Sequence, residues 1–432
     1  MAAGKALWVM LLVVAPLTGY SYAQAVALYA EASRAAVQFP ELARGLSPLD
    51  GIVVPTLGAV YLGATFLFPF VAIRALGEEK TSGSVKLLLQ LPYPTMVLVG
   101  AKLLAVMTAW LTLLLPAFIA LAHWRSAGGH LAGGETANVV LGHGLYALVV
   151  GALALAAAAV TEGGATAAIL TIGATLGFWV LDFAAAGGDG PLRKLSSLSL
   201  TALLRGFESG IFSLGAVAGA LAAAAGLLAL AAIGLRPSPS LRSRLVFSAV
   251  CVAGTGTAMG LGTGLRVYRD ASEDRRNSFA ATDEAALRRL VTPLRIEVRL
   301  AAEDPRYHDL RRRILSRLER VVPDVEITRL GPGRSALFGD GDDAYGRVEY
   351  AYGGGRVSSR STSEREILPL LFQLAGVARA TTTGVADYPG HPHVADSRSA
   401  ELVLYAGAPL LIVGGWAGAR WRQGRLPSVA QR

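Results

Sequence analysis

Long apolar runs separated by short polar segments make up most of the chain. About 20 consecutive apolar residues in helical form cross the core of a bilayer, and several runs reach that length. We therefore expect an α-helical polytopic membrane protein with about eight transmembrane helices. The expected spans are residues 6–20, 51–73, 95–122, 136–160, 165–186, 211–235, 245–265 and 400–419.

The first apolar run fits two interpretations. Lys5 followed by residues 6–20 suits a first membrane span. The same run also suits a secretory signal peptide, because Ala23-Gln24-Ala25 resembles an A-x-A cleavage site after a short apolar core. Both interpretations place residues 26–50 outside the cell, as an extracytoplasmic helix and loop. These residues alone leave open whether residues 1–25 are retained or cleaved.

Residues 266–399 break the membrane pattern, because arginine and acidic residues abound there and no span is possible. Alternating apolar residues predict strands, and amphipathic runs predict helices. Asp304 suits the cap of one helix and Ser363 that of another. The order is a strand at 294–300, a helix at 304–321, a strand at 325–330, a hairpin of 346–352 with 356–361, and a helix at 363–378. This order fits an α/β domain of thioredoxin-like shape.

The polar segment between the second and third spans, residues 77–92, has an amphipathic pattern of its own. Thr81 or Ser82 suits a helix cap, since a side-chain oxygen accepts from amides of the first turn. Pro92 and Pro94 are expected to end that helix. The residues that can share its apolar face are Val85, Leu88, Leu89 and Leu91. The pattern predicts a short helix at the membrane surface, and the alternative is an ordinary loop with one helical turn.

Composition and charge agree with a membrane protein. The 432 residues are 53% hydrophobic and only 16% charged, too apolar a mixture for an ordinary soluble protein. The formal net charge is +9, but basic residues concentrate in short segments at alternate ends of the spans. Because such segments face the cytoplasm, we expect both termini inside and residues 266–399 outside. No nucleic-acid partner is expected.

Catalytic and metal-binding patterns are scarce. The sequence contains no G-x-x-x-x-G-K-[ST] loop, so we do not expect this chain to hydrolyse ATP. His391 and His393 stand close together, but two neighbouring ligands do not make a metal site, and a solvated loop is favoured. The one cysteine, Cys251, lies in an expected span, which excludes an intramolecular disulfide and thiol exchange in the 266–399 domain. A membrane enzyme would need clustered acid, base or nucleophile groups, which the pattern does not provide.

The segment between the second and third spans resembles a known motif. Glu78-Glu79-Lys80-Thr81-Ser82-Gly83-Ser84, followed by Leu87-Leu88-Leu89 and Pro92, is similar to the E-E-K-x-x-G-[TS]-x-x-x-L-L-x-x-P pattern of ABC-type exporter permeases of the type 2 family. In that family this loop docks onto the nucleotide-binding subunit. The resemblance implies a docking site at Gly77, Glu78, Glu79, Lys80, Thr81, Gly83, Leu87, Leu88, Leu89 and Pro92. It gives the glutamates the role of polar contacts and Leu87–Leu89 that of the packing face, and it favours residues 6–20 as a retained first span.

Two further segments extend the resemblance. Residues 195–206 are similar to the S-P-x-S-H-F-x-x-F-x-R-G segment before the last permease helix, although its proline and histidine are missing. Residues 268–279 resemble the start of the auxiliary protein that pairs with gliding-motility-type ABC permeases. That auxiliary protein is normally longer than the domain at 266–399. The resemblance implies a six-helix permease domain at 1–235, a basic linker and seventh helix at 236–265, a shortened auxiliary-like domain at 266–399, and an eighth helix with a basic tail at 400–432.

The function implied by these resemblances is that of a permease subunit of an ABC exporter in the inner membrane. A separate ATPase subunit would bind ATP and Mg, so no cofactor is expected in this chain. The other implied partners are a second permease subunit, identical or different, and the lipid bilayer. The alternative is a membrane-anchored assembly or signalling component whose outer domain binds an envelope partner. Nothing in the residues names a cargo.

Overall fold

The computed structural model describes residues 5–186, 196, 199–236, 240–265, 267–301, 303–330, 345–377 and 388–424. Expectations for the linker at 237–239, for most of the segment at 195–198 and for the turns between 331 and 344 fall outside these residues. Contacts along the chain divide it into two units. The helical unit comprises Met1–Trp179, Leu200–Arg269 and Pro389–Arg432, and the soluble unit comprises Val180–Ser199 and Asp270–Tyr388.

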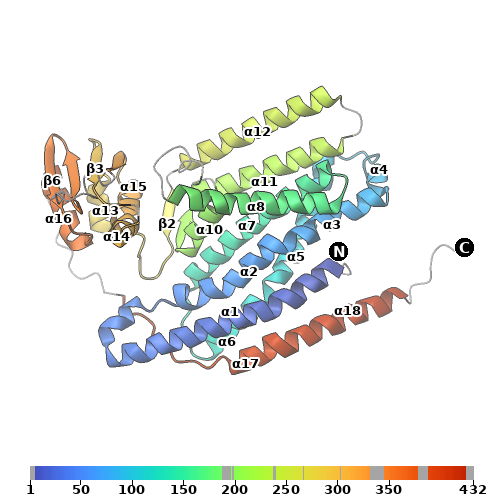
Figure 1. Cartoon of the computed structure of the whole chain (residues 1–432), viewed down its shortest axis with the longest axis horizontal. Coiled ribbons are helices and arrows are strands. Elements are labelled where there is room, and N and C mark those ends of the chain that lie inside the picture. Colours follow the sequence, from blue (N-terminus) through green and yellow to red (C-terminus); the bar gives the residue numbers. More distant parts are fainter. Residues whose placement is uncertain are drawn as a thin grey trace, which may run out of the picture. The chain divides into compact units, whose positions relative to one another are not determined.

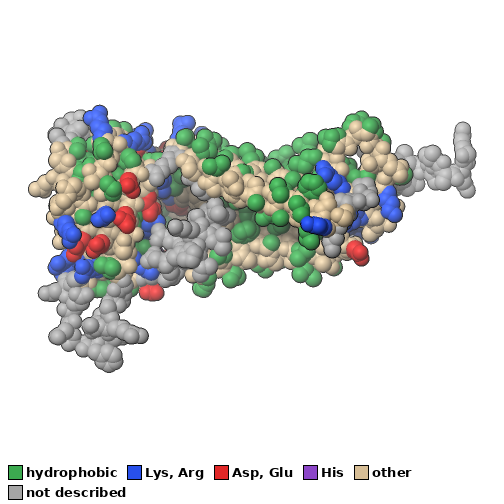
Figure 2. Space-filling model, turned by 90° about the horizontal axis from the view of Figure 1, so that it is seen from above, with side chains coloured by type: hydrophobic (Ala, Val, Ile, Leu, Met, Phe, Trp, Pro, Cys, Tyr) green, Lys and Arg blue, Asp and Glu red, His purple; other side chains and the backbone are tan. Residues whose placement is uncertain are grey.

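Eight of the described helices are long and apolar enough to cross a membrane, in agreement with the polytopic membrane protein expected from the sequence. They are Lys5–Gln38, Leu49–Thr81, Thr95–Ser126, Gly133–Val160, Gly164–Ala184, Leu214–Leu235, Arg242–Gly262 and Arg398–Trp421. Figure 2 shows hydrophobic side chains over much of the visible face of the helical unit, the kind of surface that lipid solvates.

Several spans differ from the expected bounds. The first, α1 (Lys5–Gln38), is a single helix that continues well into the segment expected to be outside. The second is built from η2 (Leu49–Val53), α2 (Val54–Phe66) and α3 (Phe68–Thr81). The third consists of α5 (Thr95–Leu113) and α6 (Leu115–Ser126). Helices α2, α3 and α6 each carry a proline in their first turn, where its missing N–H costs nothing.

The remaining elements of the helical unit follow in order. They are η1 (Pro40–Gly45), α4 (Ser84–Leu88), α7 (Gly133–Val160), α8 (Gly164–Ala186), which continues beyond the unit, α10 (Leu200–Glu208), β1 (Ile211–Ser213), α11 (Leu214–Leu235), α12 (Leu241–Thr263), β2 (Tyr268–Asp270), α17 (Arg398–Leu402), η5 (Val403–Gly407) and α18 (Ala408–Gly424). Strands β1 and β2 pair with each other. Figure 1 shows α12 beside α11 and α18 beside α1, and both pairs are in contact.

Helix α7 lies at the centre of the helical unit. It packs against α3, α5, α10 and α11, and most of its second half is small buried residues. Small side chains let helices approach closely in lipid, where packing rather than water drives association. Gly142 shows how close that approach is, because a Cβ there would come within 2.4 Å of Phe207 on α10.

The soluble unit contains a four-stranded mixed sheet in the order β4-β3-β5-β6. Strand β3 (Leu294–Val298) pairs in parallel with β4 (Val325–Arg329) and antiparallel with β5 (Val348–Tyr352), which pairs antiparallel with β6 (Gly355–Ser359). The helices are α13 (Ala281–Leu287), α14 (Pro305–Leu310), η3 (Arg311–Leu315), α15 (Ser316–Val321) and α16 (Glu364–Ala375). Leu294, Ile296 and Val298 point to one face and are buried, as the alternating pattern requires.

The two expected helix caps in this unit have different outcomes. Asp304 precedes α14, and its carboxylate accepts a hydrogen bond from the Arg306 amide at 2.9 Å, so this prediction is confirmed. Ser363 precedes α16, but its side chain makes no capping hydrogen bond, so that prediction is wrong. The hairpin turn forms at Gly353 and Gly354, whose positive φ angles of 55° and 88° favour glycine.

Replacing the Asp304 cap should loosen the start of α14. The Arg306 guanidinium beside Asp304 lowers the pKa of that carboxyl to about 2. Loss of a cap costs about 1 kcal/mol, so Asp304→Ala should raise amide exchange at residues 306–310 about fivefold at pH 7. A lowered pKa in the folded state means that the ionised cap stabilises the helix above about pH 4, the unfolded pKa, and less as pH falls toward 2.

Hydrogen exchange measured on both proteins across pH 2–7 checks this. Because intrinsic exchange rates cancel in the comparison, the difference between Asp304→Ala and the wild type should shrink below pH 4. The matched control is Asp309→Ala, whose carboxylate forms only an exposed pair with Arg312 and should change exchange less than about twofold. Equal effects of both substitutions would contradict the capping role.

Candidate functional site

The segment at residues 77–92 connects α3 to α5 through one short helix. Helix α3 continues to Thr81, and α4 occupies only Ser84–Leu88. The prediction that Thr81 or Ser82 caps α4 is wrong: the Thr81 hydroxyl donates back to the Gly77 and Glu78 carbonyls, each at 3.1 Å. Gly83 occupies the position before α4 with a φ of 74°, a left-handed conformation that glycine adopts without strain.

The apolar residues of this segment divide between the inside and the surface. Val85 is buried, and Leu89 packs partly buried against the core of the helical unit. Leu87 is 67% exposed, and beyond α4 Leu91 and Tyr93 are 48% and 68% exposed. We define Leu87, Leu91 and Tyr93 as the loop patch. Of these, only Leu87 is among the docking residues that the resemblance implied, because the matching motif does not include positions 91 and 93.

The charged residues Glu78, Glu79 and Lys80 each have a partner within the helical unit. Glu78 pairs with Arg74 one turn back on α3, and both side chains are largely exposed. Glu79 pairs with Lys102 of α5, and both side chains are mostly covered. The sequence-based expectation gave both glutamates to the partner subunit, but Glu79 reaches toward a neighbouring span.

Lys80 reaches the end of α7. Its Nζ donates to the carbonyl oxygens of Ala158, Ala159 and Thr161 at 2.9, 3.0 and 2.6 Å. The last carbonyls of a helix have no amide partner within it, and a cation there also suits the negative end of the helix dipole. Lys80 therefore caps α7 from a different helix. The sequence offers no signal for this contact, because its partners are backbone atoms far along the chain.

A cleft of about 340 Å³ lies between the end of α3 and the turn that joins α7 to α8. Its lining includes Glu162, which lies in that turn and is exposed. The full lining is Phe70, Ile73, Arg74, Gly77, Glu78, Lys80, Thr81, Ala158, Thr161, Glu162, Gly163, Gly164 and Ala167. The end of α3, at residues 77–81, and the turn at residues 161–164 thus border the same cleft.

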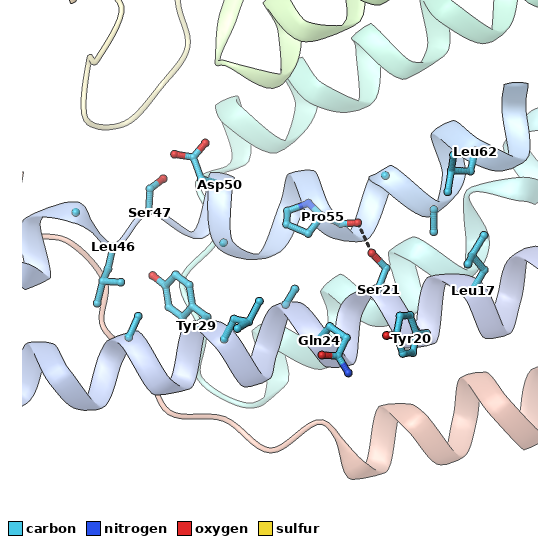
Figure 3. Close-up of a pocket in the computed structure, with 17 residues that line it drawn as sticks. Leu17, Tyr20, Ser21, Gln24, Tyr29, Leu46, Ser47, Asp50, Pro55 and Leu62 are labelled. Atoms are coloured by element: carbon cyan, nitrogen blue, oxygen red, sulfur yellow. Dashed lines mark hydrogen bonds between the residues drawn. The ribbon is translucent and has the colours of Figure 1, made fainter. Parts of the chain in front are cut away.

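A second cavity, of about 600 Å³, lies between α1 and α2. Figure 3 shows Asp50 and Ser47 near one end of it and Leu17 and Leu62 near the other. The Ser21 hydroxyl within it donates to the Pro55 carbonyl at 2.6 Å, which links α1 to α2. Its lining is mostly apolar, so the cavity is a groove on the side of the bundle.

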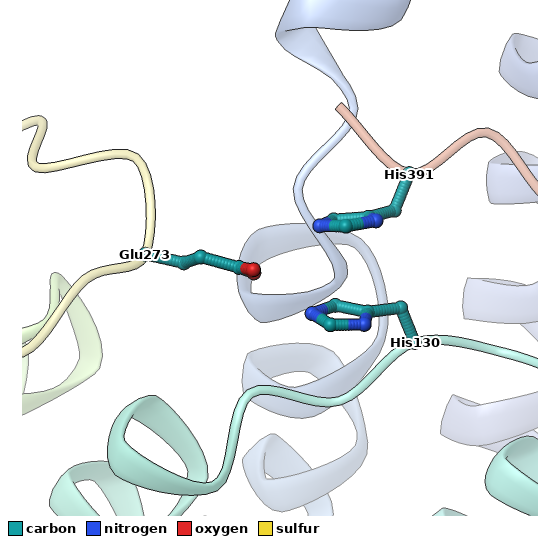
Figure 4. Close-up of side chains that lie close together, drawn as sticks. All are labelled: His130, Glu273 and His391. Carbon is teal, nitrogen blue, oxygen red and sulfur yellow. The ribbon is translucent and has the colours of Figure 1, made fainter. Parts of the chain in front are cut away.

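The histidines near the last span contact α1 and α6. The Tyr22 hydroxyl and the His123 Nδ1 are 2.8 Å apart, and His123 Nε2 lies 2.7 Å from the Ser399 hydroxyl. The rings of His130 and His391 stack with centroids 3.7 Å apart (Figure 4). The segment before α17 is also held to α1, because Tyr29 donates to the His391 carbonyl and the His393 amide donates to the Ser33 hydroxyl, so it is packed against the bundle and is not the solvated loop expected from the sequence.

Helix α7 carries buried polar side chains that the sequence reading missed. Asn138 donates to the Phe207 carbonyl at 2.9 Å, and His143 Nε2 lies 3.4 Å from a carboxylate oxygen of Glu208. His143 is only 1% exposed. Polar groups inside a membrane bundle are costly unless they meet partners, so these contacts fix α10 on α7.

The comparisons with known proteins agree with the membrane character of the first part of the chain. Residues 5–197 match a family model described as ABC-2 family transporter protein. Comparisons with curated proteins and with solved structures returned no match. The family match spans less than half of the 432 residues and includes the whole of residues 77–92. It supports a permease subunit of an ABC transporter, a membrane component that works with an ATPase and is not itself catalytic.

The two glycines of the site give a matched test of its backbone. A Cβ at Gly77 or Gly83 would meet nothing within 4 Å, so only the backbone conformation differs. Gly83→Ala should destabilise α4 by about 1 kcal/mol, because an L-residue is strained at positive φ. Gly77→Ala, within α3, should instead stabilise its helix by about as much.

Amide exchange at Lys86, whose N–H donates to the Gly83 carbonyl at 3.0 Å, reports on the opening of α4. Gly83→Ala should speed that exchange about fivefold, while Gly77→Ala should leave it equal or slower. Faster exchange in both variants would mean that space, and not backbone conformation, limits this site.

Proposed function

We propose that this chain is the transmembrane permease subunit of an ABC exporter, driven by a separate ATPase subunit that docks on residues 77–92. The observation that carries the proposal is the loop patch, which lies between two spans and inside the segment that matches the ABC-2 family model. ATP and Mg are assigned to the partner, because this chain has no phosphate-binding loop.

The chemistry of the loop patch supports a protein partner. Leu87, Leu91 and Tyr93 are large, apolar and exposed, and they are followed by Pro94. Tyrosine is enriched among residues that dominate interface energies, and exposed apolar patches mark sites that another molecule covers. Lys86 beside them is exposed and available to an acidic group on the partner.

The charge distribution supports a cytoplasmic position for residues 77–92. Arg74, Lys80, Lys86 and Lys102 lie in or beside this segment, and basic residues favour the cytoplasmic side. The larger part of the soluble unit, Asp270–Tyr388, is inserted between α12 and α17, the seventh and eighth candidate spans. With residues 77–92 inside, the order of spans assigns that unit to the outside of an inner membrane and both termini to the cytoplasm.

For the soluble unit we propose a thioredoxin-like fold and the role of a shortened gliding-type auxiliary domain. In support, a β-α-β unit with parallel β3 and β4 is followed by an antiparallel hairpin and a final helix. With no cysteine in residues 266–399, the domain cannot exchange thiols, so its role would be to bind. A second permease subunit, identical or different, completes the transporter in this proposal.

A second candidate is an assembly or signalling component of the envelope. It is favoured by the position of the soluble unit between two spans that lie beyond the family match. In that case the outer unit binds an envelope partner, and the helical unit serves as its anchor. Tight binding of an envelope protein without any stimulated ATP hydrolysis would favour this candidate.

Truncating side chains of the loop patch should weaken binding of the ATPase subunit to this chain. Leu87→Ala with Tyr93→Ala should weaken binding of the ATPase subunit about 30-fold or more, because two interface residues that contribute about 1 kcal/mol or more each add up to at least about 2 kcal/mol. The measurement is the Kd between the purified chain in nanodiscs and each ABC-type ATPase subunit encoded in the same genome. The control is Leu104→Ala, a 70% exposed residue on α5 away from this segment. Equal Kd values for wild type and double variant would refute docking at the loop patch.

A further inference from the structure

Glu79 and Lys80 stand beside the loop patch in sequence but point away from it. The charged groups of both side chains lie against other helices of the unit, whereas Leu87, Leu91 and Tyr93 face solvent. The hydrogen-bonding groups of Glu79 and Lys80 are directed at other helices of the unit and not at the loop patch. Their position calls for a different role.

Lys80 joins the end of α3 to the end of α7. Its ammonium group has three donors, and three carbonyl oxygens at 2.6 to 3.0 Å accept from it. Hydrogen bonds from a charged donor are stronger and shorter than neutral ones. The Thr161 carbonyl is one of these acceptors, so Lys80 also fixes the start of the turn that leads into α8.

Glu79 joins the same end of α3 to α5. Its carboxylate pairs with Lys102, and the two side chains are 27% and 19% exposed. The other carboxylate oxygen is buried and has no hydrogen-bond partner. Such a group is costly when its cation is removed, so the pair holds its geometry firmly.

We propose that Glu79 and Lys80 form a brace that transmits movement of residues 77–92 to α5 and α7. They are positioning residues, and the docking contacts belong to the loop patch. Neighbouring residues on α3 point to two different helices, so the end of α3 cannot shift without carrying the ends of both. This inference rests on the proposed function, because it concerns how docking is converted into movement of the spans.

If Glu79 and Lys80 act as a brace, their loss should affect coupling between the subunits and leave binding of the ATPase subunit unchanged. A docking contact contributes to the affinity of the ATPase subunit. A coupling residue instead contributes to the difference between two states of the helical unit while the partner stays bound. A residue with a purely structural role would lower the yield and stability of the chain without separating these two quantities.

The experiment measures both quantities on the full chain in nanodiscs: the Kd of the ATPase subunit, and the maximal stimulated ATPase rate at saturating subunit. Lys80→Met keeps an unbranched side chain, one atom shorter than lysine, and removes its donors. We expect the Kd to stay within about twofold and the stimulated rate to fall about tenfold, a size typical of coupling between sites. Lys80→Arg, which retains donors for carbonyl oxygens, should recover part of the rate. Lys5→Met, an exposed lysine at the start of α1, is the control and should change neither.

A charge exchange tests the second arm of the brace and does not depend on how well Lys80→Met folds. Glu79→Lys and Lys102→Glu should each lower the stimulated rate, and the double variant should restore it to within about threefold of the wild type, since a pair that couples is non-additive. Amide exchange at Thr161 and Ala167 should rise in Lys80→Met, because Lys80 holds the turn between them.

Each outcome decides between the proposals. A wild-type chain that binds no ATPase subunit would refute the proposed function. Wild-type binding with a weakened Kd and an unchanged saturating rate in Lys80→Met would make Lys80 a docking contact and overturn the brace. Unchanged values of both quantities in Lys80→Met, or no recovery in the charge-exchange double variant, would also overturn it.

Discussion

The need to satisfy helix ends governs this end of the protein. A helix that stops near the membrane exposes its last carbonyl groups, and leaving such groups without donors in a dry environment costs several kcal/mol each. At the end of α7 the Thr161 hydroxyl donates to the Ala157 carbonyl, and the Ala158 and Ala159 carbonyls accept from Lys80 on α3. This contact joins the end of α3 to the turn at residues 161–164, and the cleft lies between them.

The contact of Lys80 with α7 also helps to explain why residues 77–92 have one side packed on the bundle and one side exposed. Helix α4 has only 5 residues and would not be stable alone in water. Its ends are held because α3 is anchored through Glu79 and Lys80, and because Val85 and Leu89 pack on the core. With the polar anchors turned inward, the side chains of Leu87 and Tyr93 remain exposed at the surface.

The sequence predicted the parts of the structure that depend on local pattern. Hydropathy located all eight candidate spans, since it follows directly from the apolar length that a bilayer demands, and alternation located the strands of the soluble unit. The bounds of α1 and α4 were wrong, because helix ends depend on tertiary partners that a pattern does not contain. Glu79 and Lys102, which pair with each other, are 23 positions apart in the sequence. Lys80 and the carbonyl groups that it contacts at the end of α7 are at least 78 positions apart. A motif places such residues in the right loop without saying which way they point.

Helix α7 links the two ends of the helical unit, and its composition suits that position. At one end it is held by Lys80, and toward the other Asn138 and His143 meet α10 through polar contacts. Between them, small residues pack closely against neighbouring helices, and a close-packed interface transmits displacement instead of absorbing it. A helix is stiff along its axis, so a shift imposed on the end of α7 must be accommodated where α10 packs on Gly142.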